Sequence, residues 1–204
     1  MVYVGKGLGA IKEAADSMGN LDIIKLKAGE SKLVRFLTPP EEIVSVYEHV
    51  EQLSGRWHTI TCLGKSDCPL CKAGLRAAFR SYTAVVDRDD DKVKIFKLSK
   101  KTGSLLVGII EEYGDLRARD FKVVRIGDKL QTSYQFFAKD PSPFDFSAYA
   151  DKVPDFEKMV EPKDRDYILS LMSGGIGNTG QGGEETEEGG LSGVSYVKDE
   201  DLPF

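Results

Sequence analysis

The chain has 204 residues, of which 41% are hydrophobic and 30% charged, proportions typical of a soluble globular protein with one mid-sized domain. Its net charge of −5 argues against nucleic-acid binding, because domains of that kind usually carry an excess of basic residues. We expect no membrane partner and no secretory signal, since no apolar run approaches the roughly 20 residues that span a bilayer and residues 1–6 lack a basic flank followed by an apolar stretch.

The charge is distributed unevenly along the chain. Residues 173–204 carry a net charge of −6, so residues 1–172 carry +1. The whole-chain average therefore describes neither part, and the first part can still present basic residues to an anionic partner.

The N-terminal part is predicted to be an arm followed by strands. Residues 1–20, with Gly5, Gly7 and Gly9, are expected to form a flexible arm with one short helix. Residues 21–27 and 31–37 are predicted strands, the second ending before Pro39-Pro40. The next predicted element is a hairpin formed by residues 43–50 and 57–62 around a turn at residues 53–55.

Helices and strands alternate through the remaining folded part. One helix is predicted from Pro69 to about Phe79, with proline in its first turn. Another is predicted over residues 104–113, with Ser104 as N-cap and Gly114 as its end. The other predicted elements are strands at residues 82–87 and 93–98, a hairpin formed by residues 121–126 and 130–138, and short helices at residues 155–160 and 163–172.

Many short strands with few helices are typical of a closed antiparallel barrel. We therefore predict that residues 21–172 form a mainly β domain. The expected fold is a five-stranded oligonucleotide/oligosaccharide-binding (OB) barrel with a few short helices.

Residues 173–204 differ in composition from the rest of the chain. Glycine occupies nine of the twenty positions from 174 to 193, which is typical of a flexible linker. The chain then ends in acidic residues and an apolar tip. We expect this segment to be disordered, because it cannot bury enough apolar surface to form a core.

All three cysteines lie between positions 62 and 71, which favours a metal or redox site over a disulfide framework. Cys68 and Cys71 have the spacing at which two thiolates bind one metal ion, and Cys62 adds a third soft ligand. The fourth ligand of a structural zinc site would be His49 or His58. On an extended strand His58 lies about 13 Å from Cys62, although a bend could bring it closer, so the spacing favours His49 only slightly.

Three other interpretations of the cysteines remain open: buried cysteines without a ligand, a redox dithiol, and a zinc-ribbon module for protein interaction. Cys68-Pro69-Leu70-Cys71 could cycle as a dithiol at a helix N-terminus, but that chemistry expects a βαβ context. We favour one structural Zn²⁺ per chain. A closed four-ligand site leaves no position for a water molecule, so we expect a protein that is not an enzyme.

Basic and aromatic residues are interleaved in the first part of the chain, as in proteins that bind single strands through phosphate contacts and base stacking. Taken alone this pattern is weak, since lysines usually form solvated faces and strand aromatics usually form cores. The candidate DNA-binding residues are Arg76, Arg80, Tyr82, Lys92, Lys94, Phe96, Lys97, Lys122, Arg125, Tyr134 and Phe136.

Several of these motifs together carry a resemblance. Within roughly residues 30–137 the chain resembles the T-even-type bacteriophage single-stranded DNA-binding protein family. The motifs that match, in chain order, are Val34-Arg35-Phe36-Leu37, Glu48-His49, Gly55-Arg56-Trp57, Cys62, Cys68-Pro69-Leu70-Cys71, Ser81-Tyr82 and Ile95-Phe96-Lys97.

The resemblance implies an OB barrel with an inserted zinc-binding subdomain over about residues 44–80, and His49 as the fourth ligand beside Cys62, Cys68 and Cys71. It also implies a protein that coats single-stranded DNA without sequence preference. Such a protein would act in phage DNA replication, recombination and repair, in the cytoplasm of the infected bacterial host. Tyr82 and Tyr134 match aromatic positions of the family.

The end of the chain resembles the tip of bacterial single-stranded DNA-binding proteins, which implies that replication and repair proteins bind there. The alternative is a plain solubilising extension. The residues that match are Asp199, Glu200, Asp201, Leu202, Pro203 and Phe204.

Overall fold

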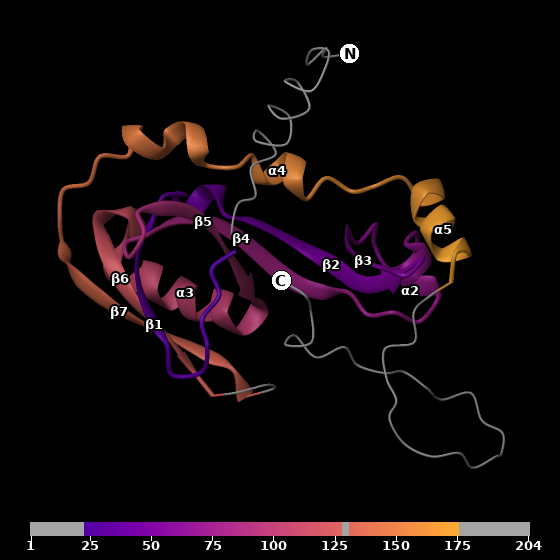
Figure 1. Ribbon diagram of the computed structural model, residues 1–204, viewed down its shortest axis with the longest axis horizontal. Coiled ribbons are helices and arrows are strands. Elements are labelled where there is room, and N and C mark those ends of the chain that lie inside the picture. The colour runs from indigo at the N-terminus through magenta and orange to yellow at the C-terminus, as the bar shows by residue number, and fades with distance from the viewer. Residues whose placement is uncertain (1–22, 128–130, 176–204) are drawn as a thin grey trace.

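The computed structural model describes residues 23–127 and 131–175 (Figure 1). The predicted N-terminal arm and residues 176–204 of the predicted acidic tail, including the six candidate partner-binding residues 199–204, lie outside the described residues. Among the described residues, the prediction of a mainly β protein is confirmed. The strands are β1 (Ser31–Phe36), β2 (Val44–Leu53), β3 (Arg56–Thr61), β4 (Ala78–Asp87), β5 (Lys92–Ser99), β6 (Arg119–Ile126) and β7 (Ser133–Pro141).

The helices are short except for one. The fourteen-residue helix α3 lies between β5 and β6, and the others connect strands or follow the last one. The α-helices are α2 (Pro69–Lys72), α3 (Lys100–Tyr113), α4 (Phe156–Met159) and α5 (Arg165–Ser173), and the 3₁₀ helices are η1 (Pro40–Glu42), η2 (Leu116–Ala118) and η4 (Ser147–Lys152).

Strand β4 is the centre of a seven-stranded antiparallel sheet. It pairs with β5 from Arg80 to Asp87 on one side. On its other side the first half of β4 pairs with β2 and the second half with β1. Two branches follow: β2 continues to β3, and β1 continues to β6 and β7. The described strands do not close into a barrel, so the prediction of a closed five-stranded barrel is not confirmed.

Both faces of the β4–β5 pair are covered, which explains why β4 is buried over most of its length. Val85 and Phe96 face a core that α3 and β6 complete. Ala84 and Ile95 alternate to the opposite face, as strand geometry requires, and form a second core there. The cover of this second core is residues 142–164, called the strap below, which runs from the end of β7 to α5 (Figure 1).

The strap begins at a buried cation. Arg35 is 1% exposed, forms an ion pair with Asp120 at 2.6 Å, and donates hydrogen bonds to the backbone and side-chain oxygens of Ser142. Its guanidinium also lies 4.9 Å from the centroid of the Phe144 ring. These contacts fix the direction in which the chain leaves β7.

A third core joins the β2–β3 hairpin to the end of the described chain. Leu53, Ile60 and Leu70 are buried with Ile168 of α5. Ser54, in the hairpin turn, donates from its hydroxyl to the Leu171 carbonyl at 2.8 Å. Helix α5 therefore packs beside β2, β3 and α2, far along the molecule from β7 (Figure 1).

Three predicted elements differ in the structure. Of the strand predicted at residues 21–27, the described residues 23–27 do not form a strand, and Ile23 makes an isolated bridge to Ile95. The helix predicted to reach Phe79 ends at Lys72, because Gly74 adopts a positive φ of 85° and the chain then enters β4. Helix α3 starts earlier than predicted because Ser99, not Ser104, is its N-cap and accepts a hydrogen bond from the Thr102 amide.

We expect Phe156→Ala to lower the free energy of unfolding by about 3–5 kcal/mol, because it would open a cavity between the strap and the β4–β5 face. Phe156 is 5% exposed and packs against Tyr82. Phe137→Ala is the control, since that ring is 50% exposed, and it should cost about 1 kcal/mol or less. Chemical denaturation measures both; equal losses would contradict this description of the strap.

Candidate metal centre and adjoining cleft

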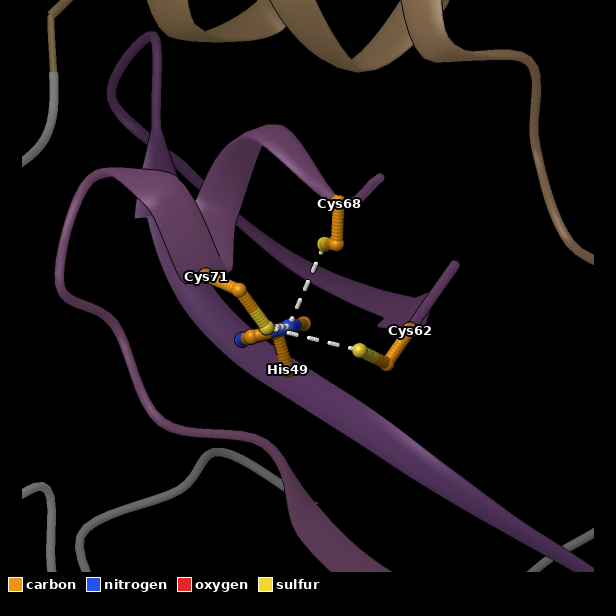
Figure 2. A group of neighbouring side chains, drawn as sticks. All are labelled: His49, Cys62, Cys68 and Cys71. Atoms are coloured by element: carbon orange, nitrogen blue, oxygen red, sulfur yellow. Dashed lines mark hydrogen bonds between the residues drawn. The ribbon is translucent and has the colours of Figure 1, made fainter. Parts of the chain in front are cut away.

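Four side chains from three elements meet at one end of the β2–β3 hairpin (Figure 2). His49 lies on β2, and Cys62 directly follows β3. Cys68 caps the N-terminus of α2, and Cys71 lies within that helix, which begins at Pro69. The pairing of His49 with Ile60 brings the imidazole to the face on which the chain then turns into Cys62.

The donor atoms lie at distances that suit a single metal ion. The Nε2 of His49 is 3.4 Å from the Cys68 sulfur and 3.5 Å from the Cys71 sulfur, and the Cys62 and Cys71 sulfurs are 3.5 Å apart. All four donor atoms lie within 4.8 Å of one another. A tetrahedral zinc ion with Zn–S of about 2.3 Å and Zn–N of about 2.0–2.1 Å would place its donors about 3.6–3.8 Å apart.

The chemistry of the donor set also fits zinc. Three thiol sulfurs and one imidazole nitrogen form a complete structural ligand set. The cysteines are not joined by disulfides. His58 pairs with Glu51 further along the hairpin and is not part of the group. Among the two histidines, the structure thus brings His49 to the cysteines.

The electrostatics of the group favour a bound cation. Burial lowers the pKa of His49, which keeps the ring neutral and able to ligate. Burial and the neighbouring Cys62 raise the pKa of Cys71 to about 12. Burial opposes ionisation of Cys68 as well, but hydrogen bonds from backbone amides outweigh it and lower its pKa. Three thiolates cannot coexist here without a compensating charge, and a divalent metal ion supplies one.

The second ring nitrogen of His49 has a different environment. Its Nδ1 is buried, and it has no hydrogen-bond partner within residues 23–127 and 131–175. Metal-binding histidines usually donate from this nitrogen to a carboxylate or carbonyl oxygen. The orientation of this ring therefore depends on burial and on the Nε2 contacts with the sulfurs.

A cleft of about 230 Å³ lies on the other face of the same hairpin, between β5, the hairpin and the end of the strap. It contains both acidic and basic side chains on an apolar background. Its lining residues are Ile23, Glu48, Thr59, Thr61, Tyr82, Ile95, Lys97, Met159, Val160, Glu161 and Lys163. The Thr61 hydroxyl donates to the Val160 carbonyl at 2.7 Å, which holds the strap against the hairpin at this point.

Glu48 lies at the floor of the cleft and is 2% exposed. It accepts a hydrogen bond from the Tyr82 hydroxyl. Its Oε1 is 2.5 Å from Lys97 Nζ and 3.8 Å from Arg80 Nε. Burial and the neighbouring Glu48 raise the pKa of Tyr82, so the phenol stays protonated and remains a donor.

The structure separates the candidate DNA-binding cations into two groups. Arg76, Lys92 and Lys122 are exposed. The others are buried or partly buried: Arg80 and Lys97 pair with Glu48, Lys94 pairs with Asp87 and Asp90, and Arg125 donates to the Leu26 carbonyl and the Thr132 hydroxyl. These residues do not form one continuous exposed surface.

The candidate stacking aromatics lie mostly in cores. Phe96 is 2% exposed, and its ring contacts Tyr134 and Phe136, which are half-buried on the same side. Tyr82 is also buried, although it lines the cleft. Phe96 is not placed to stack on a base, because strand alternation directs its side chain toward α3 rather than toward the cleft.

Three residues that the sequence did not nominate as site residues are exposed or line the cleft in the structure. Phe137 is half-exposed and pairs with Lys122 across β6 and β7. Alternation along β7 could have identified it, since Tyr134 and Phe136 share the other face. Glu48 and Lys163 carry no sequence signal for a shared site, because the fold brings them together over more than a hundred residues.

Comparison of the chain with models of known protein families, with curated proteins and with solved structures gives no significant match to any of them. Within the described ranges, no helix combines the length and the apolar character needed to cross a membrane.

We expect purified protein to contain about one zinc ion per chain, and His49→Ala to lose it, because three sulfurs leave the site open. His58→Ala is the matched control and should keep the metal. Elemental analysis measures both, and addition of a strong chelator should lower the melting temperature of the wild-type chain. If His49→Ala kept zinc and His58→Ala lost it, the fourth ligand would be His58 and not His49.

Proposed function

We propose that this protein is a sequence-independent single-stranded DNA-binding protein that protects single strands and recruits partners in phage DNA replication, recombination and repair. The proposal rests on one observation. The β2–β3 hairpin and α2, which together bring the four possible metal ligands into one group, are inserted between β1 and β4, and a partly polar cleft lies where the hairpin meets the sheet. This arrangement agrees with the resemblance found in the sequence. The place of action would be the cytoplasm of the infected bacterial host.

The order of the strands supports the fold that such a function needs. Without the hairpin, the sheet consists of β1, β4, β5, β6 and β7, with β1 between β4 and β6 and with α3 between β5 and β6. Five strands in this order would suit an OB fold, which is a partly open barrel. The contacts of Phe96 on β5 with Tyr134 and Phe136 on β7 would then close the barrel through side chains rather than backbone hydrogen bonds.

The cleft is the proposed place where the strand contacts this face of the protein. It joins the outer side of β5 to the hairpin, and Lys97, Lys163 and Tyr82 lie on its lining. In OB folds the face of the second and third strands, which would be β4 and β5 in this chain, binds oligonucleotides. Cations near this face would neutralise phosphates, and aromatic and apolar groups would contact bases.

Zinc would have a structural role in this function. His49, Cys62, Cys68 and Cys71 would hold it, and the ion would supply folding free energy to a hairpin and a one-turn helix that are too small to hold themselves. Four protein ligands leave no coordination position for a substrate, which supports a protein that is not an enzyme. The presence of His49 and a third sulfur beside Cys68 and Cys71 favours a metal site over a redox dithiol.

The acidic end of the chain would act as a competitor and a docking tip. Residues 173–204 carry −6, and a glycine-rich linker would hold the tip near the cleft at high effective concentration. DNA would displace the tip, and Leu202, Pro203 and Phe204 would then bind a replication or repair protein.

We expect the chain to bind oligo-dT, with an affinity that falls steeply as salt rises, because each phosphate contact releases about 0.7 counterions from a single strand. The fluorescence of Trp57, on β3 near Thr59 of the cleft lining, would report binding. Duplex DNA of equal length is the control and should bind more weakly. Absence of binding to oligo-dT at low salt would reject the proposed function.

Deletion of residues 198–204 should tighten binding to oligo-dT at low salt, because it removes three carboxylates that compete with phosphate, and it should abolish capture of partner proteins. The double variant Leu202→Ala/Phe204→Ala is the control: it keeps the charges, so its affinity for oligo-dT should equal that of the wild type. Titrations at low and high salt measure both. Equal affinity of the deletion and the wild type would leave the tail without a competing role.

A further inference from the structure

Glu48 is an acidic residue in a cleft that we propose for a polyanion. Its side chain is almost completely buried, and it contacts three of the residues that the sequence nominated for DNA binding: Arg80, Tyr82 and Lys97. Its partners come from β4 and β5, while Glu48 itself comes from the metal hairpin. One carboxylate therefore engages several binding candidates from the body of the protein.

The ion pair controls how much positive charge the floor of the cleft can offer. The side chain of Lys97 is 10% exposed and that of Arg80 is 9% exposed. A phosphate that entered this floor would have to compete with Glu48 for both cations. It would also meet the repulsion of a carboxylate in a poorly hydrated site, where charges interact more strongly than in water.

The cleft differs between its floor and its rim. Lys163 lies on the lining where the chain leaves the strap, and it is exposed, as is Glu161 on the same lining. Thr59 and apolar side chains such as Ile95 line the remaining wall. At about 230 Å³, the cleft is smaller than the roughly 300–1,000 Å³ of sites for drug-sized ligands. It has room for a group of the size of one nucleobase.

We propose that Glu48 is a specificity-determining residue of the cleft, which keeps phosphate out of the floor and reserves it for an uncharged nucleobase. By holding Lys97 and Arg80, Glu48 confines phosphate contacts to the rim, where Lys163 lies. The cleft would then discriminate single-stranded DNA from polyanions that have no bases. This inference rests on the proposed function, because it assigns a role within the proposed DNA site.

The test is the salt dependence of oligo-dT binding by the full chain and by Glu48→Gln. The glutamine keeps the size and an acceptor oxygen for Tyr82 but removes the negative charge 2.5 Å from Lys97, the nearer of the two cations, so that a phosphate can pair with Lys97. Arg80, at 3.8 Å, still donates to the Phe79 carbonyl. We expect the slope of log K against log salt to become steeper by about 0.7, the value for one added contact with a single strand. Inorganic polyphosphate, which has no bases, should bind Glu48→Gln at least ten-fold more tightly than it binds the wild type.

Two further variants make the result specific. The double variant Glu48→Gln/Lys97→Gln should return the slope to the wild-type value, because it removes the cation that the first substitution released. Glu157→Gln, on the exposed side of α4 and outside the cleft lining, removes the same unit of charge and should leave the slope unchanged. Zinc content and melting temperature of each variant verify that it is folded.

The outcomes separate the inference from the proposed function. If the wild type binds oligo-dT and Glu48→Gln shows an unchanged or shallower slope, the inference is wrong and the proposed function stands. The inference is also overturned if the double variant stays as steep as Glu48→Gln, or if Glu157→Gln reproduces the effect. If the wild type does not bind oligo-dT at all, both are rejected. A variant that fails to fold is replaced by Glu48→Met, which has a similar length and no charge, with the same expected slope.

Discussion

The register of β2 is the constraint on which both sites depend. Successive side chains on a strand point to opposite faces, so Glu48 enters the cleft while His49, the next residue, meets the three cysteine sulfurs. A shift of one residue would turn the carboxylate to the face of the sulfurs and the imidazole to the face of the cleft. The register is fixed by pairing with β3 and β4 and by a two-residue turn in which Ser54 and Gly55 both have positive φ, as tight hairpins require.

The two faces of the sheet also determine how the body of the protein is packed. Because β4 and β5 are apolar on both sides, the sheet needs a second cover besides α3, and the strap supplies it through Phe156 and its neighbours. The strap also continues to α5, which completes the core of the metal hairpin through Ile168. The two ends of the molecule are therefore connected twice, once by β2 and once by the strap. The cleft lies between these two connections.

Features decided by neighbouring residues could be predicted from the sequence. The β2–β3 hairpin and the metal spacing of Cys68 and Cys71 are of this kind. Features decided by remote partners could not. Phe96 and Tyr82 have the same local sequence pattern as exposed strand aromatics. Phe96 is buried by residues of β7, and Tyr82 is buried by Phe156 of the strap. The early end of α2 depends on the backbone conformation of Gly74, which the alanine and leucine spacing around it conceals.

The charge balance illustrates why counting cations is a poor guide to a polyanion site. Asp87 is fully buried and still has a lowered pKa: burial alone would raise it, but hydrogen bonds from Lys32 and Lys94 outweigh that effect. Lys94 and Lys97 are thus neutralised by carboxylates within the fold, even though they lie on a strand rich in lysine. Buried pairs are screened little by salt and release no counterions when DNA binds. In the proposed function, the attraction for phosphate would therefore come from exposed cations, such as Lys163 at the rim of the cleft and Lys92 and Lys122 on β5 and β6.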